Sequence, residues 1–230
     1  MRWNRLAAVA GIASVLVAFV EFFGPGFPQT GASARVLDAY FVDHRSWTLA
    51  AVAVQGLSNA IWVVFLCGLA LLLRHVGSAP AATVALTGGA LNVAISLAGL
   101  AGIAAVSFRI AGSGDPALTM AFFQLSAMTL VLSNFMLALM AAGVACARVA
   151  TWFRYTSGLA ATVFLAGGGA LARHGAFSPD GAVQFATYAL ELLWTIAAVV
   201  VLLRTAPDPT RRALTSKETQ RGEPSVALGQ

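Results

Sequence analysis

Long stretches without a charged residue constrain this chain more than any other feature of its sequence. Five stretches contain no Asp, Glu, Lys or Arg, namely 6–20, 46–73, 75–108, 116–147 and 155–172. A sixth stretch, 181–203, contains only Glu191. A transmembrane helix needs about 20 consecutive, predominantly apolar residues. The sequence therefore predicts an all-α fold, a polytopic integral membrane protein.

The composition excludes several other classes of protein. Of the 230 residues, 59% are hydrophobic and 10% are charged, whereas a soluble domain has about 25% charged residues. A soluble enzyme, a secreted disulfide scaffold and a DNA-binding domain are therefore excluded. No nucleic-acid partner is expected despite the net charge of +5, because the arginines flank the apolar segments. The expected partner is the lipid bilayer.

Hydropathy and turn signals divide the chain into six predicted spans. Pro80 breaks the charge-free run that starts at His75, and Asp115-Pro116 combines a capping side chain with a proline at the first helical position. A turn at 178–181 precedes the last span. Because the fourth and fifth spans are separated by only about four residues, they must be antiparallel neighbours. The predicted six-helix bundle consists of Leu6–Phe23, Thr48–Leu73, Ala82–Phe108, Pro116–Ala147, Trp152–Leu171 and Ala182–Leu203.

The distribution of basic residues predicts the orientation of this bundle. With six spans both termini lie on one side, which carries ten Lys and Arg residues. The opposite side carries four, Arg35, Arg45, Arg109 and Arg173. Because loops rich in Lys and Arg stay in the cytoplasm, both termini are predicted to be cytoplasmic, in a bacterial plasma (inner) membrane. Residues 1–205 form the transmembrane domain, and the polar residues 206–230 are predicted to be a disordered tail.

The first span shares some features with a signal peptide. It begins with basic residues and is followed by Ala32-Ser33-Ala34, a possible cleavage site. Its apolar core of about 18 residues is longer than that of a signal peptide, and the site lies well beyond the core. The first span is therefore expected to be retained.

Four polar side chains fall at a similar depth in the predicted membrane. Asn59, Asn134 and Glu191 each lie 13–15 residues before the arginine that ends their own span. At about 1.5 Å per residue, they lie roughly 20–22 Å from the inner boundary, and Glu21 lies about 24 Å from Arg5. These residues form one polar layer in the outer third of a hydrocarbon core about 30 Å thick.

The polar layer has a functional and a structural interpretation. An ionisable group inside a membrane is costly, so Glu191 is predicted to face the bundle interior or a wet cavity. Tyr188 and Gln55 extend the polar faces around Glu191 and Asn59. The functional interpretation is an outward-facing pocket that binds or transports a small ligand or cation, and Glu191 favours it. In the structural interpretation, the amide side chains form hydrogen bonds between helices and so hold the bundle together. Such a bond is worth about 0.6 kcal/mol on average. An interfacial position is the alternative for Glu21.

The longest outer loop, from Gly24 to Trp47, supplies a second group of candidates. Residues Ala32–Arg45 are predicted to form a short interfacial helix, because apolar residues recur at four-residue spacing. Such a helix lies along the membrane surface or over the mouth of the bundle. An interfacial anchor is the favoured interpretation and a ligand lid is the alternative for Tyr40, Asp43, His44 and Arg45.

Motifs for catalysis and cofactor binding are not recognisable. No histidine lies within a predicted span, and phosphate-binding and dinucleotide motifs are absent. Thr156-Ser157-Gly158 weakly resembles an intramembrane serine motif but lacks the leading glycine and a later histidine as base. Cys67 and Cys146 lie within spans and form no C-x-x-C motif. The chain is therefore predicted to be no enzyme and to need no cofactor or metal.

Glycines recur within the predicted spans. They occur at Gly88, Gly89, Gly99, Gly102, Gly158 and Gly167 to Gly169. Small residues let helices approach closely in lipid, where packing contacts drive association. These glycines are therefore interpreted as packing positions.

Several short motifs resemble a family of uncharacterised six-helix integral membrane proteins of actinobacteria. They are Glu21-Phe22-Phe23-Gly24-Pro25, the stretch from Ala39 to Arg45, Asp115-Pro116 and Leu202-Leu203-Arg204. The ratio of 13 Arg to one Lys is typical of a high-GC genome. The resemblance covers nearly all of residues 1–205 and implies the six-helix topology, but no activity and no catalytic residues. A non-catalytic scaffold or regulatory protein that acts through its tail and loops stays the alternative function.

Overall fold

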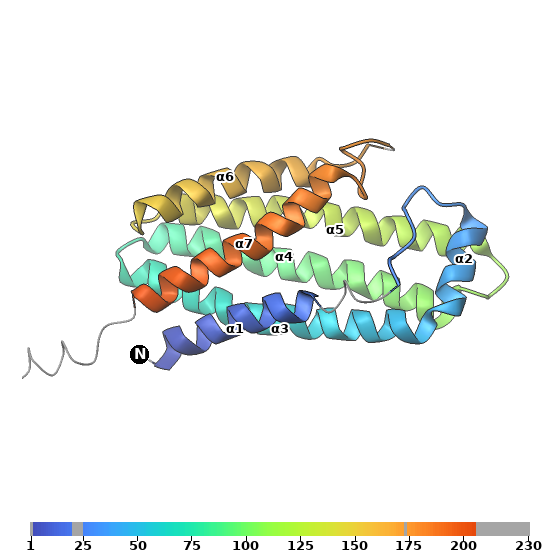
Figure 1. The fold of residues 1–230 in the computed structure, drawn as a ribbon, viewed down its shortest axis with the longest axis horizontal. Coiled ribbons are helices and arrows are strands. Elements are labelled where there is room, and N and C mark those ends of the chain that lie inside the picture. Colours follow the sequence, from blue (N-terminus) through green and yellow to red (C-terminus); the bar gives the residue numbers. More distant parts are fainter. Residues whose placement is uncertain (1, 20–24, 173, 206–230) are drawn as a thin grey trace, which may run out of the picture.

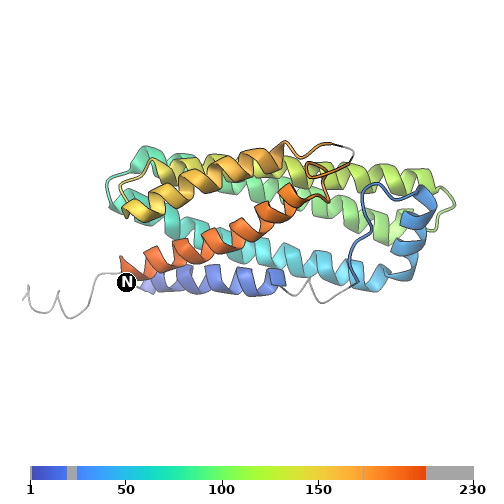
Figure 2. The ribbon, with the colours of Figure 1, turned by 45° about the horizontal axis from the view of Figure 1, so that its top comes forward.

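The computed structural model describes residues 2–19, 25–172 and 174–205, and these residues form helices and connections without a strand. The helices lie side by side as a bundle, except for α2 (Ala34–Asp43), which crosses one end of it (Figures 1 and 2). The all-helical prediction is confirmed. The helices are α1 (Arg2–Phe19), α2 (Ala34–Asp43), α3 (Arg45–His75), α4 (Ala79–Ala105), α5 (Pro116–Ala145), α6 (Thr151–Gly168) and α7 (Ala182–Arg204), with a π-helical turn, η2 (Val106–Ile110), continuing α4.

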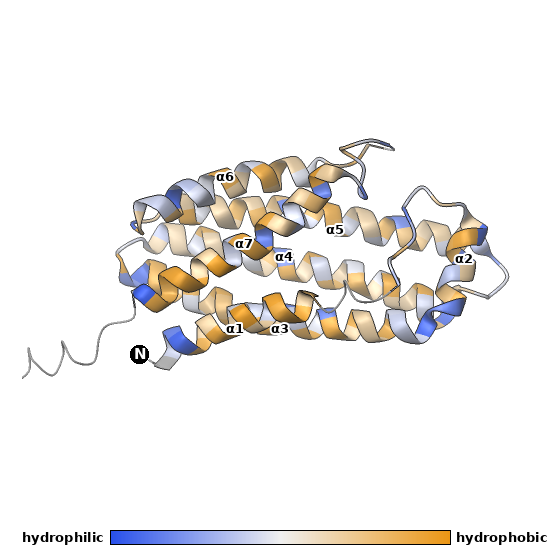
Figure 3. Ribbon diagram, viewed as in Figure 1, coloured by the Kyte–Doolittle hydropathy of each residue, from blue (hydrophilic) through white to orange (hydrophobic). Residues whose placement is uncertain are grey.

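Among the described residues, four helices are long and apolar enough to cross a membrane. They are Arg45–His75, Ala79–Ile110, Pro116–Ala145 and Ala182–Arg204. The apolar residues run along the helices, whereas hydrophilic residues gather at the two ends of the bundle (Figure 3). These features indicate a membrane protein. Of the other two predicted spans, α1 is apolar but shorter, and α6 contains Arg154 and hydroxyl side chains in its first half.

Two of the predicted helix starts are confirmed in atomic detail. Asp115 Oδ1 accepts hydrogen bonds from the backbone N–H groups of Ala117 and Leu118, at 3.1 and 3.2 Å. Pro116 follows as the first residue of α5. Before α7, the N–H of Gly181 donates to the carbonyl oxygen of Ser178 at 2.9 Å.

Other predicted helix ends were wrong by a few residues. α4 begins at Ala79 and contains Pro80 in its first turn, because the N–H groups of a first turn have no intrahelical acceptor to lose. α6 ends at Gly168, before the predicted Leu171, and α2 is shorter at both ends than Ala32–Arg45. α1 begins at Arg2, before the predicted Leu6. Residues 20–23 of the first predicted span and the predicted tail, 206–230, lie outside the described residues.

The glycine interpretation is confirmed for α4 and α5, which pack with their backbones in close contact. A Cβ atom added at Gly88 would lie 2.6 Å from the backbone nitrogen of Met140. One added at Gly143, which the sequence analysis missed, would lie 2.8 Å from that of Ala85. The interpretation was wrong for Gly158, whose added Cβ would meet nothing closer than 4.0 Å.

The buried apolar core is divided into two clusters. The larger one fills the end of the bundle near the termini and includes Phe65, Leu73 and Val144. The smaller one lies under α2 and includes Phe41 and Phe123. Asn59, Asn134 and Glu191 of the predicted layer line a cavity whose wall also includes Leu137 of the larger cluster and Phe123 of the smaller one.

Candidate functional site

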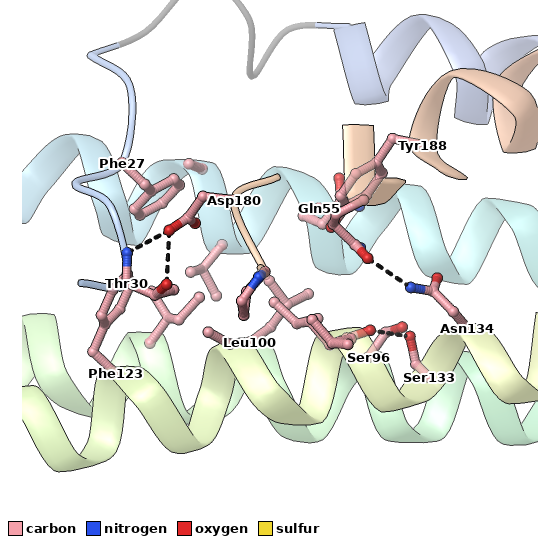
Figure 4. Close-up of a pocket in the computed structure, with 18 of the residues that line it drawn as sticks. Phe27, Thr30, Gln55, Ser96, Leu100, Phe123, Ser133, Asn134, Asp180 and Tyr188 are labelled. Carbon is pink, nitrogen blue, oxygen red and sulfur yellow. Dashed lines mark hydrogen bonds between the residues drawn. The ribbon is translucent and has the colours of Figure 1, made fainter. Parts of the chain in front are cut away.

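A cavity occupies the space between the two apolar clusters (Figure 4). Its polar lobe has a volume of about 340 Å³ and is lined from α3, α4, α5 and α7. An adjoining aromatic lobe of about 420 Å³ lies between α1, α3 and α7 and includes Trp47, Trp62 and Phe185. The polar side chains of the first lobe are Thr30, Gln55, Asn59, Asn92, Ser96, Ser133, Asn134, Asp180, Gln184, Tyr188 and Glu191.

The structure brings most of the predicted ligand-binding residues together. Gln55, Asn59, Tyr188 and Glu191 line both lobes, and Asn134 lines the polar lobe. Their convergence follows from the constant rise of an α-helix, which converts equal residue counts into equal depth. The sixth candidate, Glu21, lies outside the described residues.

Three of the amide side chains that line the polar lobe, those of Asn134, Gln184 and Asn59, have partners in the protein. Asn134 Nδ2 donates to Gln184 Oε1 at 3.0 Å, and both residues are buried. This bond joins α5 to α7. Asn59 Nδ2 donates to the backbone oxygen of Gln55, one turn earlier on α3, at 3.1 Å. Asn134 therefore has the packing role that the structural interpretation assigns to the amides.

Two other amides retain acceptors without a partner. Gln55 Oε1 and Asn92 Oδ1 are buried, and no described residue donates a hydrogen bond to them. Asn92 is only 5% exposed, and its side chain lines both lobes. A buried polar atom without a partner costs about 1–3 kcal/mol. The cavity wall therefore has hydrogen-bonding capacity that the described protein does not use.

Glu191 is the only acid in the described part of α7, and it lies at the junction of the two lobes. Its side chain is half-buried and makes no hydrogen bond or ion pair with any described residue. No Lys, Arg or His is among the described residues that line either lobe. Among the described residues, the charged groups that line the cavity are therefore two carboxylates, Glu191 and Asp180.

The mouth of the polar lobe lies where the segment 25–30 meets the connection before α7. Asp180 Oδ2 accepts hydrogen bonds from the N–H and the hydroxyl of Thr30, at 2.6 and 2.7 Å (Figure 4). From α5, Gln124 Nε2 donates to the Thr30 carbonyl oxygen at 3.3 Å. Thr30 thus joins three parts of the chain across the mouth.

The predicted lid or interface residues lie outside the lining of the cavity. Tyr40, Asp43, His44 and Arg45 do not line either lobe. The Tyr40 hydroxyl donates to the Pro25 carbonyl oxygen at 3.2 Å, and burial raises the pKa of Tyr40. The His44 ring stacks on that of Tyr40, Arg45 Nη2 donates to the Ala111 carbonyl oxygen at 3.1 Å, and Asp43 is exposed.

α2 reaches the cavity indirectly, through Phe27. This side chain lines both lobes, and its ring centroid lies 6.1 Å from that of Tyr40 and 6.5 Å from that of Phe41. α2 is fixed in turn by Asp38, which accepts a hydrogen bond from the Thr119 hydroxyl at 2.7 Å. α2 therefore supports one wall of the cavity from outside.

Sequence reasoning missed Asn92, although a signal was available. The depth comparison included only one outward-running span, and Asn92 is on another, α4. Counted from Ser78, the residue before α4, Asn92 lies 14 residues along the helix, which agrees with the 13–15 residues of the predicted layer. The mouth residues Thr30 and Asp180 gave no such signal, because they lie in connections.

Ser157 has a structural contact in place of a catalytic one. Its Oγ accepts a hydrogen bond from Trp194 Nε1 at 3.0 Å, in a buried contact between α6 and α7.

A scan of protein-family models and searches of curated proteins and solved structures give no match to this chain. The resemblance to actinobacterial six-helix proteins therefore stays a prediction.

Proposed function

We propose that this protein crosses the bacterial plasma membrane six times, with both termini in the cytoplasm, and binds a small ligand in its cavity from the outer side. The observation that carries the proposal is Glu191, a half-buried carboxylate with no partner among the described residues, which lines both lobes. Ionisable residues within membrane-spanning segments are costly and mark ligand or ion sites.

The packing of the two less apolar helices supports six spans. α1 contacts α3 and α7, and α6 contacts α5 and α7. Both helices lie alongside the four apolar helices (Figure 1), so they would occupy the same slab of membrane. Eighteen residues in each give a length of about 27 Å at 1.5 Å per residue, close to the thickness of about 30 Å that a hydrocarbon core has.

The position of the mouth supports access from the outer side. Thr30 and Asp180 line the end of the polar lobe that faces α2, whereas both ends of the described chain lie at the opposite end of the bundle (Figure 1). The large apolar cluster separates the cavity from that opposite end. With cytoplasmic termini, the cavity therefore opens outward.

Cysteine labelling tests this access directly. In a background with Cys67→Ala and Cys146→Ala, single cysteines are placed by Ala51→Cys in the cavity wall and Ala198→Cys in the apolar core. We expect a membrane-impermeant thiol reagent, added to intact cells, to label the cavity cysteine and spare the core cysteine. Absence of labelling at position 51, or equal labelling at both positions, would contradict an outward-open cavity.

A further inference from the structure

We propose that the ligand of this cavity is an organic cation, an ammonium group attached to an apolar body. This inference rests on the ligand-binding function proposed above and names the chemical class. Three observations carry it: the sign of the charge that lines the cavity, the unpartnered acceptors in its wall, and its size and apolar surfaces.

The charge of the cavity has one sign. Glu191 and Asp180 line the polar lobe, and among the described lining residues there is no basic side chain to balance them. Asp180 already accepts two hydrogen bonds from Thr30, whereas Glu191 makes none with the described residues. A cation placed beside Glu191 gains a charge-assisted hydrogen bond, and an anion there would be repelled.

The unpartnered polar atoms of the wall are acceptors. Gln55 Oε1 and Asn92 Oδ1 have no donor among the described residues, and both side chains line the same two lobes as Glu191. An ammonium group carries several N–H donors and no acceptor. It can therefore satisfy the carboxylate and an amide oxygen together, which a carboxylate ligand cannot do.

The size of the cavity argues against a bare metal ion. A metal such as Ca²⁺ requires about six to eight oxygen ligands at 2.3–2.6 Å. The described residues contain no group of three or more His, Cys, Asp or Glu side chains that could hold a metal. Lobes of about 340 and 420 Å³ are instead within the range of about 300–1,000 Å³ that small organic ligands occupy.

The aromatic lobe provides the surface for the apolar body. Trp62 is buried in its wall, and Phe27 and Tyr188 line both lobes. Aromatic faces bind apolar groups and also attract cations through their ring quadrupoles. The ammonium group therefore lies at Glu191, where the lobes meet, and the body extends between α1, α3 and α7.

A series of probes with one body and three head groups tests the assignment. The probes are 2-phenylethylammonium, 2-phenylethanol and phenylacetate, titrated into the purified full-length protein in detergent, with melting temperature and calorimetric affinity as readouts. An alkylammonium stays charged at neutral pH. We expect the ammonium probe to bind about tenfold or more tightly than the alcohol, the difference expected for one charge-assisted hydrogen bond. Phenylacetate should not bind.

Two variants locate the head group. Glu191→Gln should weaken binding of the ammonium probe by about tenfold and leave the alcohol unchanged, because a nearly isosteric amide keeps the hydrogen bond but loses the charge. Asp43→Asn is the matched control, since it removes an exposed carboxylate that does not line either lobe. It should leave both affinities unchanged.

The outcomes separate this inference from the function on which it rests. Equal or tighter binding of the alcohol or of phenylacetate would overturn the cation assignment and leave the cavity a ligand site. No binding of any probe would also overturn the assignment. The head-group comparison uses the unmodified protein, so it decides the question even when Glu191→Gln fails to fold. The proposed function itself fails if the impermeant thiol reagent does not label the Ala51→Cys variant in intact cells.

Discussion

Asn134 and Asn92 show how one residue type at one depth serves two purposes. Both are about 95% buried and line the polar lobe, with exposed fractions of 4% and 5%. Asn134 donates to Gln184 and so joins α5 to α7. Asn92 Oδ1 has no donor among the described residues. The first is a packing contact and the second is part of the proposed ligand site.

This difference predicts opposite effects of the same substitution. Asn134→Leu should destabilise the protein by about 1–3 kcal/mol, because it leaves the buried Gln184 oxygen without its donor. Asn92→Leu should leave stability unchanged or increase it, because it removes an atom that has no partner. The measurement is unfolding in detergent with both variants in parallel. A larger loss for Asn92→Leu would show that its amide, and not that of Asn134, holds the helices together.

Tyr40 predicts a dependence of stability on alkaline pH. Burial raises its pKa above the ordinary value of 10.0, so the unfolded chain ionises at lower pH than the folded protein. The contribution of Tyr40 is therefore constant below pH 10 and is lost as the pH rises through the folded-state pKa. Melting temperatures from neutral to alkaline pH should fall less steeply above this value for Tyr40→Phe than for the unmodified protein. If the melting temperatures of the two proteins fall in parallel with rising pH, a group other than Tyr40 causes the alkaline sensitivity.

At the scale of the elements, the close approach of α4 and α5 depends on glycine. The backbone nitrogen of Met140 lies where a side chain at Gly88 would begin. Because backbone atoms cannot move aside as a flexible side chain can, even a methyl group at this position must separate the two helices. A Cβ atom added at Gly158, on α6, would meet nothing closer than the Ala145 Cβ atom, at 4.0 Å.

The two glycines therefore form a matched pair for alanine substitution. Gly88→Ala should destabilise the bundle by about 1–3 kcal/mol through overpacking. Gly158→Ala should be neutral or stabilise α6 by up to about 1 kcal/mol, because alanine has the higher helix propensity. Thermal unfolding in detergent measures both effects. If the Gly88→Ala variant has the same melting temperature as the unmodified protein, α4 and α5 are free to separate.

At the scale of the whole molecule, the helices differ in length. α3 and α5 contain 31 and 30 residues, or about 45 Å at 1.5 Å per residue, which exceeds a hydrocarbon core of about 30 Å. α1 and α6 end well before the α2 end of the bundle (Figures 1 and 2). We therefore expect α3, α4 and α5 to project beyond the membrane on the α2 side.

The orientation can be tested at two exposed connections. In the cysteine-free background, Ser33→Cys lies before α2 and Ala150→Cys lies between α5 and α6, and both positions are exposed. With both termini in the cytoplasm, an impermeant thiol reagent should label position 33 in intact cells. It should label position 150 only after the membrane is permeabilised. The reverse pattern would invert the proposed topology.

The sequence alone determined the features that depend on local chemistry. Charge-free runs predicted apolar helices, because the cost of a charge in hydrocarbon applies residue by residue. The Asp115 cap predicted the start of α5, because the backbone N–H groups that donate to its carboxylate lie within the same turn. The convergence of Glu191, Asn59 and Asn134 on one cavity was also predictable, because the rise of an α-helix is constant.

The tertiary structure decided which of these side chains have partners. Whether Asn134 meets Gln184, or Asn92 meets no donor, depends on how α4, α5 and α7 are rotated and packed. The contact between Thr30 and Asp180 joins residues 150 positions apart. No local pattern encodes such a contact, since it arises only when packed helices bring two connections together. The sequence thus fixes the depth of each polar group, and the packing of the helices decides whether that group is satisfied by the protein or left for a ligand.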